Sequence, residues 1–282
     1  MSEAISSRRS FHLIIEGEND PSRGLNIREL WRHRDLLWFM TLRDITVRYR
    51  QTLLGPIWAV LQPLLSAGVF SVFFGTVAKM PSDGVPYSLF GFSGLILWLL
   101  FSNTIGRCSG SLVGNAHLLN KVYFPRVLIP LSNTIPGVID FGIAFVVLLL
   151  GCFFYGIYPS WKAVFWMPLV VGMTALLALG FGLFLGALNV RYRDVNNGVS
   201  FLLQLMMFAT PVVYPLSLVR ADYRWLAGLN PMVGLMEALR GCLFNHPIDL
   251  SLLGISAAMT VAWLYLGGRY FFKVEKHFAD IV

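Results

Sequence analysis

The sequence predicts an all-α polytopic membrane protein with six transmembrane helices, an N-terminal interfacial amphipathic helix, and re-entrant helices before the last span. Three observations predict this class: the overall composition, the length of the apolar segments, and the placement of Lys and Arg around them. The 282 residues are 56% hydrophobic and 13% charged, with a mean hydropathy of +0.65. A soluble domain of this size cannot bury so much apolar side chain, whereas a bilayer accommodates it.

Six segments reach the roughly 20 apolar residues that a helix needs to cross the hydrocarbon core. They are residues 56–77, 88–105, 127–154, 163–190, 201–219 and 250–272. A seventh stretch, 225–244, contains Asn230-Pro231, Glu237 and Arg240. Because charges at the bilayer centre are costly and Asn-Pro interrupts a helix, we expect a pair of short re-entrant or interfacial helices over about 222–246, buried against protein.

An interfacial helix is predicted ahead of the first span. Its apolar residues recur at spacings of three, four or seven: Ile27, Leu30, Trp31, Leu37, Trp38, Leu42 and Ile45. The opposite face is charged: Arg28, Glu29, Arg32, Asp35 and Arg43. This pattern is typical of a helix lying in the membrane interface, although a helix packed on a soluble partner remains open. The predicted domains are a cytoplasmic tail, 1–26, an interfacial region, 27–53, and a transmembrane domain, 54–282.

The orientation follows from Lys and Arg, which collect on the cytoplasmic side of membrane spans. Nine precede Leu54, three lie between the second and third predicted spans, two between the fourth and fifth, and three near the C-terminus. Thus 17 of the 22 lie on one side. We expect a multi-pass protein of the inner (cytoplasmic) membrane with both termini in the cytoplasm. The same rule explains the net charge of +7 without a nucleic-acid partner.

Motifs for catalysis, metal binding and nucleotide binding are absent from the sequence. It has no GxxxxGK[ST], HExxH or CxxC pattern, and the dipeptide Gly-Lys does not occur. The three cysteines have no paired spacing. We therefore predict no catalytic residue, no metal site and no cofactor in this chain, which argues against an enzyme.

Two features are candidate functional sites. Asp140 is the one acid deep inside a predicted span, where a carboxylate marks either a functional site or a packing contact between helices. The packing interpretation is favoured because no second ionisable residue lies deep inside the other predicted spans to form a relay. The segment 115–126 mixes apolar and basic residues on the cytoplasmic side, and either docks on a soluble partner or rests on lipid headgroups as a connector.

Several spaced motifs resemble those of the type-two ABC exporter permeases, and within them the polysaccharide branch. They are RDI at 43–45, RYRQT at 48–52, LG at 54–55, Trp58, LQP at 61–63, NKVYFPR at 120–126, NVRYRDV at 189–195, PVVYP at 211–215, NP at 230–231 and FAD at 278–280. The resemblance extends from about Leu36 to the C-terminus.

The resemblance implies a homodimer that works with two separate ATP-binding-cassette subunits, where ATP and Mg would bind. It implies that the segment 115–126 docks on the ATPase, through Asn115, Leu118, Leu119, Lys121, Val122, Phe124, Pro125 and Arg126. A second cytoplasmic loop carries Arg191, Arg193 and Asp194. The substrate it implies is a polyprenyl-pyrophosphate-linked polysaccharide, with lipopolysaccharide O-antigen ahead of capsule or teichoic acid.

Arg48 and Arg50, at the headgroup level, are candidates to contact the pyrophosphate, because guanidinium pairs with phosphate through two hydrogen bonds. Contact with anionic membrane lipid or with the ATPase is the alternative. A type-two permease for a drug or lipo-oligosaccharide, and less so a membrane glycosyl or polyprenyl transferase, remain alternative functions.

Overall fold

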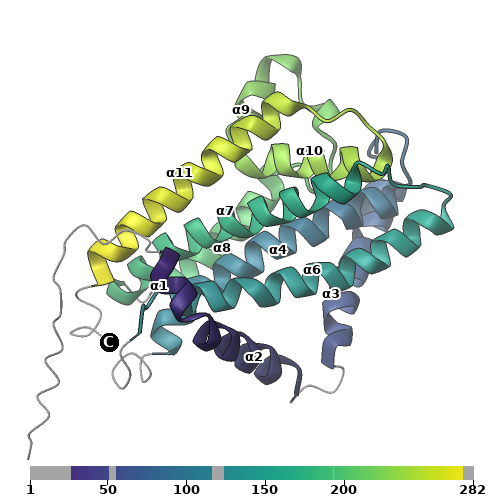
Figure 1. The fold of residues 1–282 in the computed structure, drawn as a ribbon. Coiled ribbons are helices and arrows are strands. Elements are labelled where there is room, and N and C mark those ends of the chain that lie inside the picture. Colours follow the sequence, from purple (N-terminus) through teal and green to yellow (C-terminus); the bar gives the residue numbers. More distant parts are fainter. Residues whose placement is uncertain (1–26, 51–54, 116–123, 193, 276–282) are drawn as a thin grey trace, which may run out of the picture.

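A computed structural model describes residues 27–50, 55–115, 124–192 and 194–275 (Figure 1). These residues are almost entirely helical and contain no β-strand. The N-terminal part comprises α1 (Ile27–Arg32), α2 (Arg34–Arg50), a short 3-10 turn (Gly55–Ile57) and α3 (Trp58–Phe70), which continues as a π-helix (Ser71–Val77). The central helices are α4 (Tyr87–Gly114), α6 (Leu128–Phe154) and α7 (Ala163–Arg191). The remainder comprises α8 (Val195–Ala209), 3-10 turns at Leu216–Leu218 and Ala221–Tyr223, α9 (Arg224–Gly228), α10 (Pro231–Phe244) and α11 (Leu250–Glu275).

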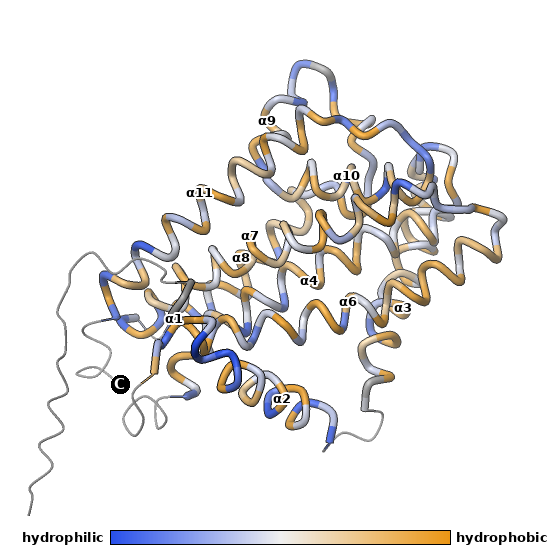
Figure 2. The backbone as a smooth tube through the Cα atoms, viewed as in Figure 1, coloured by the Kyte–Doolittle hydropathy of each residue, from blue (hydrophilic) through white to orange (hydrophobic). Residues whose placement is uncertain are grey.

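Five helical segments in the described part of the chain are long and apolar enough to cross a membrane: Trp58–Val77, α4, α6, α7 and α11. They confirm the all-α polytopic class, and the count of six crossings stays a prediction. Figure 2 shows hydrophobic residues along these helices and hydrophilic residues at α2 and at the ends of the bundle. Large apolar side chains point outward, as at Leu150 (62% exposed) on α6 and Val261 (68%) on α11, and this surface requires lipid or protein around it.

The predicted fifth span, 201–219, is wrong in its bounds. The helix there is α8, with 15 residues, and it ends at Ala209. Thr210 precedes Pro211 and is extended, with ψ 141°, as expected for a residue before proline. Pro215 then removes a second backbone donor. The chain from Thr210 to Pro215 is consequently irregular.

This irregular segment is buried, so its carbonyl groups need donors from elsewhere. Arg240 of α10 supplies two, from Nη1 to the Pro211 carbonyl (2.7 Å) and from Nη2 to the Val212 carbonyl (2.8 Å). Its guanidinium also lies 3.6 Å from the centre of the Phe90 ring. These contacts explain how an arginine that is only 4% exposed is accommodated in an apolar bundle.

Short helices occupy the segment predicted as re-entrant. Asn230 caps α10 by accepting a hydrogen bond from the Met232 amide (3.0 Å), with Pro231 at the first helical position. Apart from Glu237, the residues of α10 are buried. The depth of α9 and α10 in a bilayer stays a prediction.

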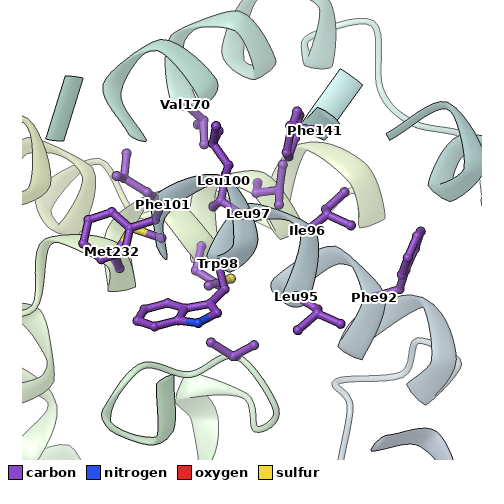
Figure 3. Packing of buried hydrophobic residues seen from close by; sticks show 14 of the residues in the cluster. Phe92, Leu95, Ile96, Leu97, Trp98, Leu100, Phe101, Phe141, Val170 and Met232 are labelled. Atoms are coloured by element: carbon purple, nitrogen blue, oxygen red, sulfur yellow. The ribbon is translucent and has the colours of Figure 1, made fainter. Parts of the chain in front are cut away.

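The core centres on α4, whose side chains are buried on nearly every side (Figure 3). It packs between α6 and α7, with Leu97, Phe101 and Leu112 fully buried. The crossing of α7 and α11 is closer still: a Cβ added to Gly267 would lie 2.1 Å from the Gly180 carbonyl oxygen. Small residues at such crossings allow backbones in membrane bundles to touch.

The predicted faces of the interfacial helix are wrong in part. Of the residues expected on one apolar face, Leu37 and Ile45 turn toward the bundle, whereas Trp38 (59% exposed) and Leu42 face outward. The inward face also carries polar residues, among them Arg43, which had been expected on the opposite side. The pattern failed because the charges of α2 bind partners on other helices, as described next.

Candidate functional site

Two polar layers lie where α2 meets α4 and α6. α2 packs along the first half of α6, at the end of the bundle where α4 finishes and α6 begins (Figure 1). Its inward positions recur at helical spacing, and in the second half of the helix they include Asp44, Arg48 and Tyr49. These side chains, with Arg43, reach polar groups on both neighbouring helices.

The inner layer centres on the carboxylate of Asp140 on α6. Its Oδ2 pairs with Arg48 of α2, and it also accepts from Nη2 of Arg107 on α4 at 3.0 Å. Its Oδ1 accepts a hydrogen bond from the Tyr49 hydroxyl. Three donors from two other helices therefore satisfy one carboxylate that is only 14% exposed, which is the arrangement that allows a charge to be buried.

The electrostatics of this layer leave one positive charge in excess, because two guanidinium groups face a single carboxylate. Arg107 and Arg48 keep side-chain exposures of 24% and 35%, so the excess charge is partly accessible. Burial, followed by the hydrogen bond to Asp140, raises the pKa of Tyr49 to about 12. The phenol therefore keeps its proton at physiological pH and acts as a donor.

The expectation that Asp140 lacks an ionisable partner is wrong. Arg107 was assigned to a cytoplasmic loop because the second span was predicted to end at residue 105, but α4 continues to Gly114. The buried Cys108 and Leu112 carry the apolar face of α4 past Arg107. Their helical spacing is the signal in the sequence that would have extended the helix.

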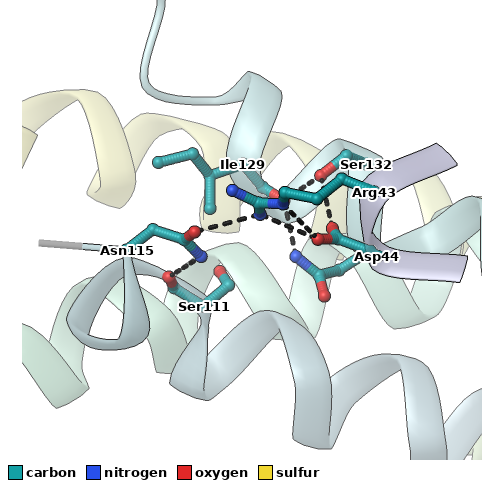
Figure 4. Close-up of polar contacts among 7 residues, drawn as sticks. Arg43, Asp44, Ser111, Asn115, Ile129 and Ser132 are labelled. Carbon is teal, nitrogen blue, oxygen red and sulfur yellow. Dashed lines mark hydrogen bonds and ion pairs between the residues drawn. The ribbon is translucent and has the colours of Figure 1, made fainter. Parts of the chain in front are cut away.

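The outer layer, shown in Figure 4, centres on Arg43 and Asp44. Arg43 donates to Oδ1 of Asp44 from Nε (3.0 Å) and Nη2 (2.7 Å), and also from Nη2 to Oδ1 of Asn115 (3.0 Å). Asn115 in turn donates to the Ser111 carbonyl at 2.9 Å. The Ser132 hydroxyl donates to the Ile129 carbonyl at 2.9 Å and lies 3.4 Å from Oδ2 of Asp44. One adjacent pair on α2 thus contacts both α4 and α6.

The structure describes only the ends of the predicted ATPase-docking segment. Asn115 lies in the outer layer, and Phe124 is buried in a cluster with Met40 and Phe271. Arg126, which follows Pro125, donates to the Glu275 carbonyl at the end of α11. Four predicted docking residues lie outside the described residues: Leu118, Leu119, Lys121 and Val122. Docking at this segment stays a prediction.

The remaining predicted residues lie at the surface of the same end of the bundle. Arg191, the last residue of α7, and Asp194, just before α8, are exposed, and Arg193 lies outside the described residues. Arg50 is exposed at the end of α2, whereas Arg48 turns inward to Asp140. The two arginines proposed to act together therefore have different surroundings.

A small, open cleft lies beside the inner layer, between α3, α4 and α6. Arg48 and Asp140 contribute to its lining, and Gln62 and Asn103 are the other polar residues there. The walls are apolar: Trp58, Ala59, Pro63, Ile96, Leu99, Leu100, Gly137, Phe141 and Ala144. A cleft with apolar walls and a cationic edge is suited to an amphiphile with an anionic group. Among the described residues, no group of three or more His, Cys, Asp or Glu is placed to hold a metal ion.

Comparison with known proteins places these features in context. The family described as "ABC-2 type transporter" matches residues 35–244. The chain is 32% identical over 259 residues to the O-antigen export system permease protein RfbA of Myxococcus xanthus, covering 91% of this chain and 98% of that protein. It is 28% identical to the RfbA protein of Klebsiella pneumoniae, over 88% and 95% of the two chains. It is 22% identical to the polysialic acid transport protein KpsM of Escherichia coli, over 80% and 88%.

Proposed function

The chain belongs to the ABC-2 type transporter family, and from this premise we propose that it exports polysaccharide linked to a polyprenyl-pyrophosphate carrier. It is the membrane subunit of a polysaccharide exporter, not an enzyme. The observation that supports a polysaccharide substrate is that the relatives of this chain agree in the class of molecule they are named for. Two kinds of relative, covered over most of their length, are named for the export of O-antigen and for the transport of polysialic acid, which are both polysaccharides. These names favour polysaccharide over a drug as the substrate.

O-antigen is the first candidate for the glycan, because the O-antigen permeases are the more similar relatives, at 32% and 28% identity against 22% for the polysialic acid protein. Capsule or teichoic acid export is the alternative. The energy comes from ATP-binding-cassette partners, consistent with the absence of a P-loop from this sequence. The proposed assembly contains two copies of this chain and two ATPase subunits, which bind ATP and Mg. It sits in the inner membrane with both termini in the cytoplasm.

The proposed site for the carrier's pyrophosphate is the cationic edge of the cleft. Arg48 lies in its lining, and the inner layer retains one positive charge after Asp140 is paired. Exposed Arg50 lies two residues further along the chain. Guanidinium groups suit a pyrophosphate because each can donate two parallel hydrogen bonds. The apolar walls of the cleft provide a surface for the first part of the polyprenyl chain.

A reconstituted complex tests this function. This chain and its ATP-binding partner are placed in proteoliposomes with a fluorescent polyprenyl-pyrophosphate glycan, and the fraction protected from an added glycosidase is followed. We expect the fraction of glycan that is protected from the glycosidase to change when ATP and Mg are added. We expect no change when a non-hydrolysable ATP analogue replaces ATP. Equal movement without hydrolysis, or movement of a drug but not of the glycan, would refute the proposal. Variants in which Arg48 and Arg50 are both Gln test the pyrophosphate site; normal export by an intact complex would exclude that role.

A further inference from the structure

Arg43 and Asp44 contact the C-terminal end of α4 and the N-terminal end of α6. Arg43 donates to Asn115, which caps the C-terminal end of α4, at 3.0 Å. Asp44 faces Ser132, in the second turn of α6, at 3.4 Å. Between those two ends the chain passes through the segment 116–127. Figure 4 shows the pair lying between the two helix ends.

The inner layer repeats this arrangement deeper in the same pair of helices. Arg107 lies eight residues before Asn115 on α4, and Asp140 lies eight residues after Ser132 on α6. Because α4 and α6 are antiparallel, Arg107 and Asp140 lie opposite each other, and so do Asn115 and Ser132. The two layers are therefore about 12 Å apart along the helices, at 1.5 Å per residue. α2 enters both layers, through Arg43 and Asp44 in the outer one and through Arg48 and Tyr49 in the inner one.

Apolar packing holds the first half of α2, where Met40, Leu36 and Leu37 join a buried cluster, and polar contacts hold its second half. Met40 and Thr41 are the only fully buried residues of α2. Apolar surfaces tolerate small sliding movements, whereas hydrogen-bonded ion pairs have discrete geometries. α2 is joined to α6 by the Arg48–Asp140 ion pair in the inner layer, and to the ends of α4 and α6 by hydrogen-bond contacts with Asn115 and Ser132 in the outer layer. A helix held by directional contacts at two depths has a small number of preferred positions, which is what an element needs to carry a conformational signal.

We propose that Arg43 and Asp44 are positioning residues for transport, which pass a displacement of the α4 and α6 ends through α2 to Asp140 and the cleft. This inference rests on the proposed function, because the displacement originates in an ATP-binding partner. A change in the separation of Asn115 and Ser132 moves the Arg43–Asp44 pair. α2 moves as one 17-residue helix, so Arg48 shifts relative to Asp140. Since both of these residues line the cleft, its cationic edge is rearranged.

Paired variants of the assembled complex test this role. Arg43→Gln and Asp44→Asn remove the outer contacts, and Arg34→Gln and Asp35→Asn are matched controls. Arg34 and Asp35 form an ion pair of 3.6 Å on the outward face of α2, with side-chain exposures of 62% and 94%. Coupling between sites typically amounts to roughly 5- to 150-fold, so we expect the outer-layer variants to export about tenfold less glycan for each ATP hydrolysed. The controls should export as the unmodified complex does.

The ratio of export to hydrolysis separates positioning from simple stability, because a misfolded subunit loses both activities together. Should Arg43→Gln or Asp44→Asn fail to assemble, the double variant Asn115→Ala and Ser132→Ala decides, since it removes the amide oxygen that accepts from Arg43 and the hydroxyl that faces Asp44. A ratio equal to that of the controls overturns the inference while the proposed function stands. An unmodified complex without ATP-dependent export overturns the proposed function itself.

A direct readout of α2 gives a second test. Thr46 is exposed on the outward face of α2, and the three native cysteines are buried, so a Thr46→Cys variant accepts an environment-sensitive fluorophore selectively. We expect ATP to shift the emission of the labelled complex, and we expect Arg43→Gln or Asp44→Asn to abolish the shift. A shift of the same size in those variants would show that α2 responds by another route, against the proposal.

Discussion

The side chains of Arg107 and Asp140 meet at 3.0 Å across the interface between α4 and α6. With Arg48 and Tyr49 arriving from α2, they form the point at which three helices are joined through one carboxylate. Removal of that carboxylate should weaken the contacts among all three helices.

Asp140→Asn is therefore expected to destabilise the protein. The variant leaves two guanidinium groups without their counter-ion. Loss of one partner from a fully buried pair costs about 3–5 kcal/mol. Because Arg48 and Arg107 are partly exposed, we expect a smaller loss, about 2 kcal/mol. Thermal unfolding in detergent measures it, with Arg34→Gln as the control. Unchanged stability together with unchanged export would remove Asp140 from both structural and functional roles.

The raised pKa of Tyr49 predicts that the stability of the fold depends on pH in the alkaline range. Its pKa rises from 10.0 to about 12 on folding, chiefly through burial and then through the hydrogen bond to Asp140. A raised pKa stabilises the fold below pH 10, and this contribution is lost as the pH rises from 10 to about 12. The difference in stability between the unmodified chain and Tyr49→Phe should thus shrink over that window. A constant difference would contradict the raised pKa of Tyr49.

Arg240→Gln should impair folding more than any exposed substitution does. The shorter side chain cannot supply both hydrogen bonds to the Pro211 and Val212 carbonyls. Each buried carbonyl left unsatisfied costs about 1–3 kcal/mol. We expect loss of monodisperse protein in gel filtration, whereas Arg220→Gln, at a side chain that is 77% exposed, should behave normally. A well-folded Arg240→Gln chain would show that the irregular segment is held by other contacts.

Gly267→Ala should disrupt the crossing of α7 and α11. The added methyl group would lie 2.1 Å from the Gly180 carbonyl oxygen, and only a shift of the backbone can relieve that contact. Overpacking of this kind typically costs about 1–3 kcal/mol. Gly254→Ala, on the same helix, has nothing within 4 Å of the added atom and serves as the control. Equal melting temperatures for the two variants would mean that α11 separates from α7 without cost.

The bundle was predictable from sequence because long apolar runs leave little choice of structure. The runs around α3, α4, α6, α7 and α11 all appear as helices at the predicted places. The errors have two sources: the prolines that end α8 at Ala209 inside a predicted span, and a polar residue interpreted as a boundary. Arg107 was read as the start of a loop, yet it lies inside α4 because Asp140 neutralises it from another helix.

The polar layers were beyond sequence reasoning for a related reason. Arg48 and Asp140 are 92 residues apart, and no periodicity within a single segment reports a contact at that separation. The same long-range pairing turned part of the charged face of α2 inward. Its apolar Trp38 was thereby placed outside, where a helix analysed alone would not be expected to put it.

The outward aromatic face of α2 has a consequence for purification and for engineering. Trp38, Phe39 and Val47 are 59%, 68% and 67% exposed, on the side of the helix away from the Asp140 contacts. The prediction that α2 lies in the membrane interface implies that substituting them with serine leaves the ion pairs intact and weakens the binding of α2 to lipid. The choice of detergent or lipid headgroup should then affect this one helix. Such variants should be more soluble in detergent and should transport less in the bilayer than the unmodified protein.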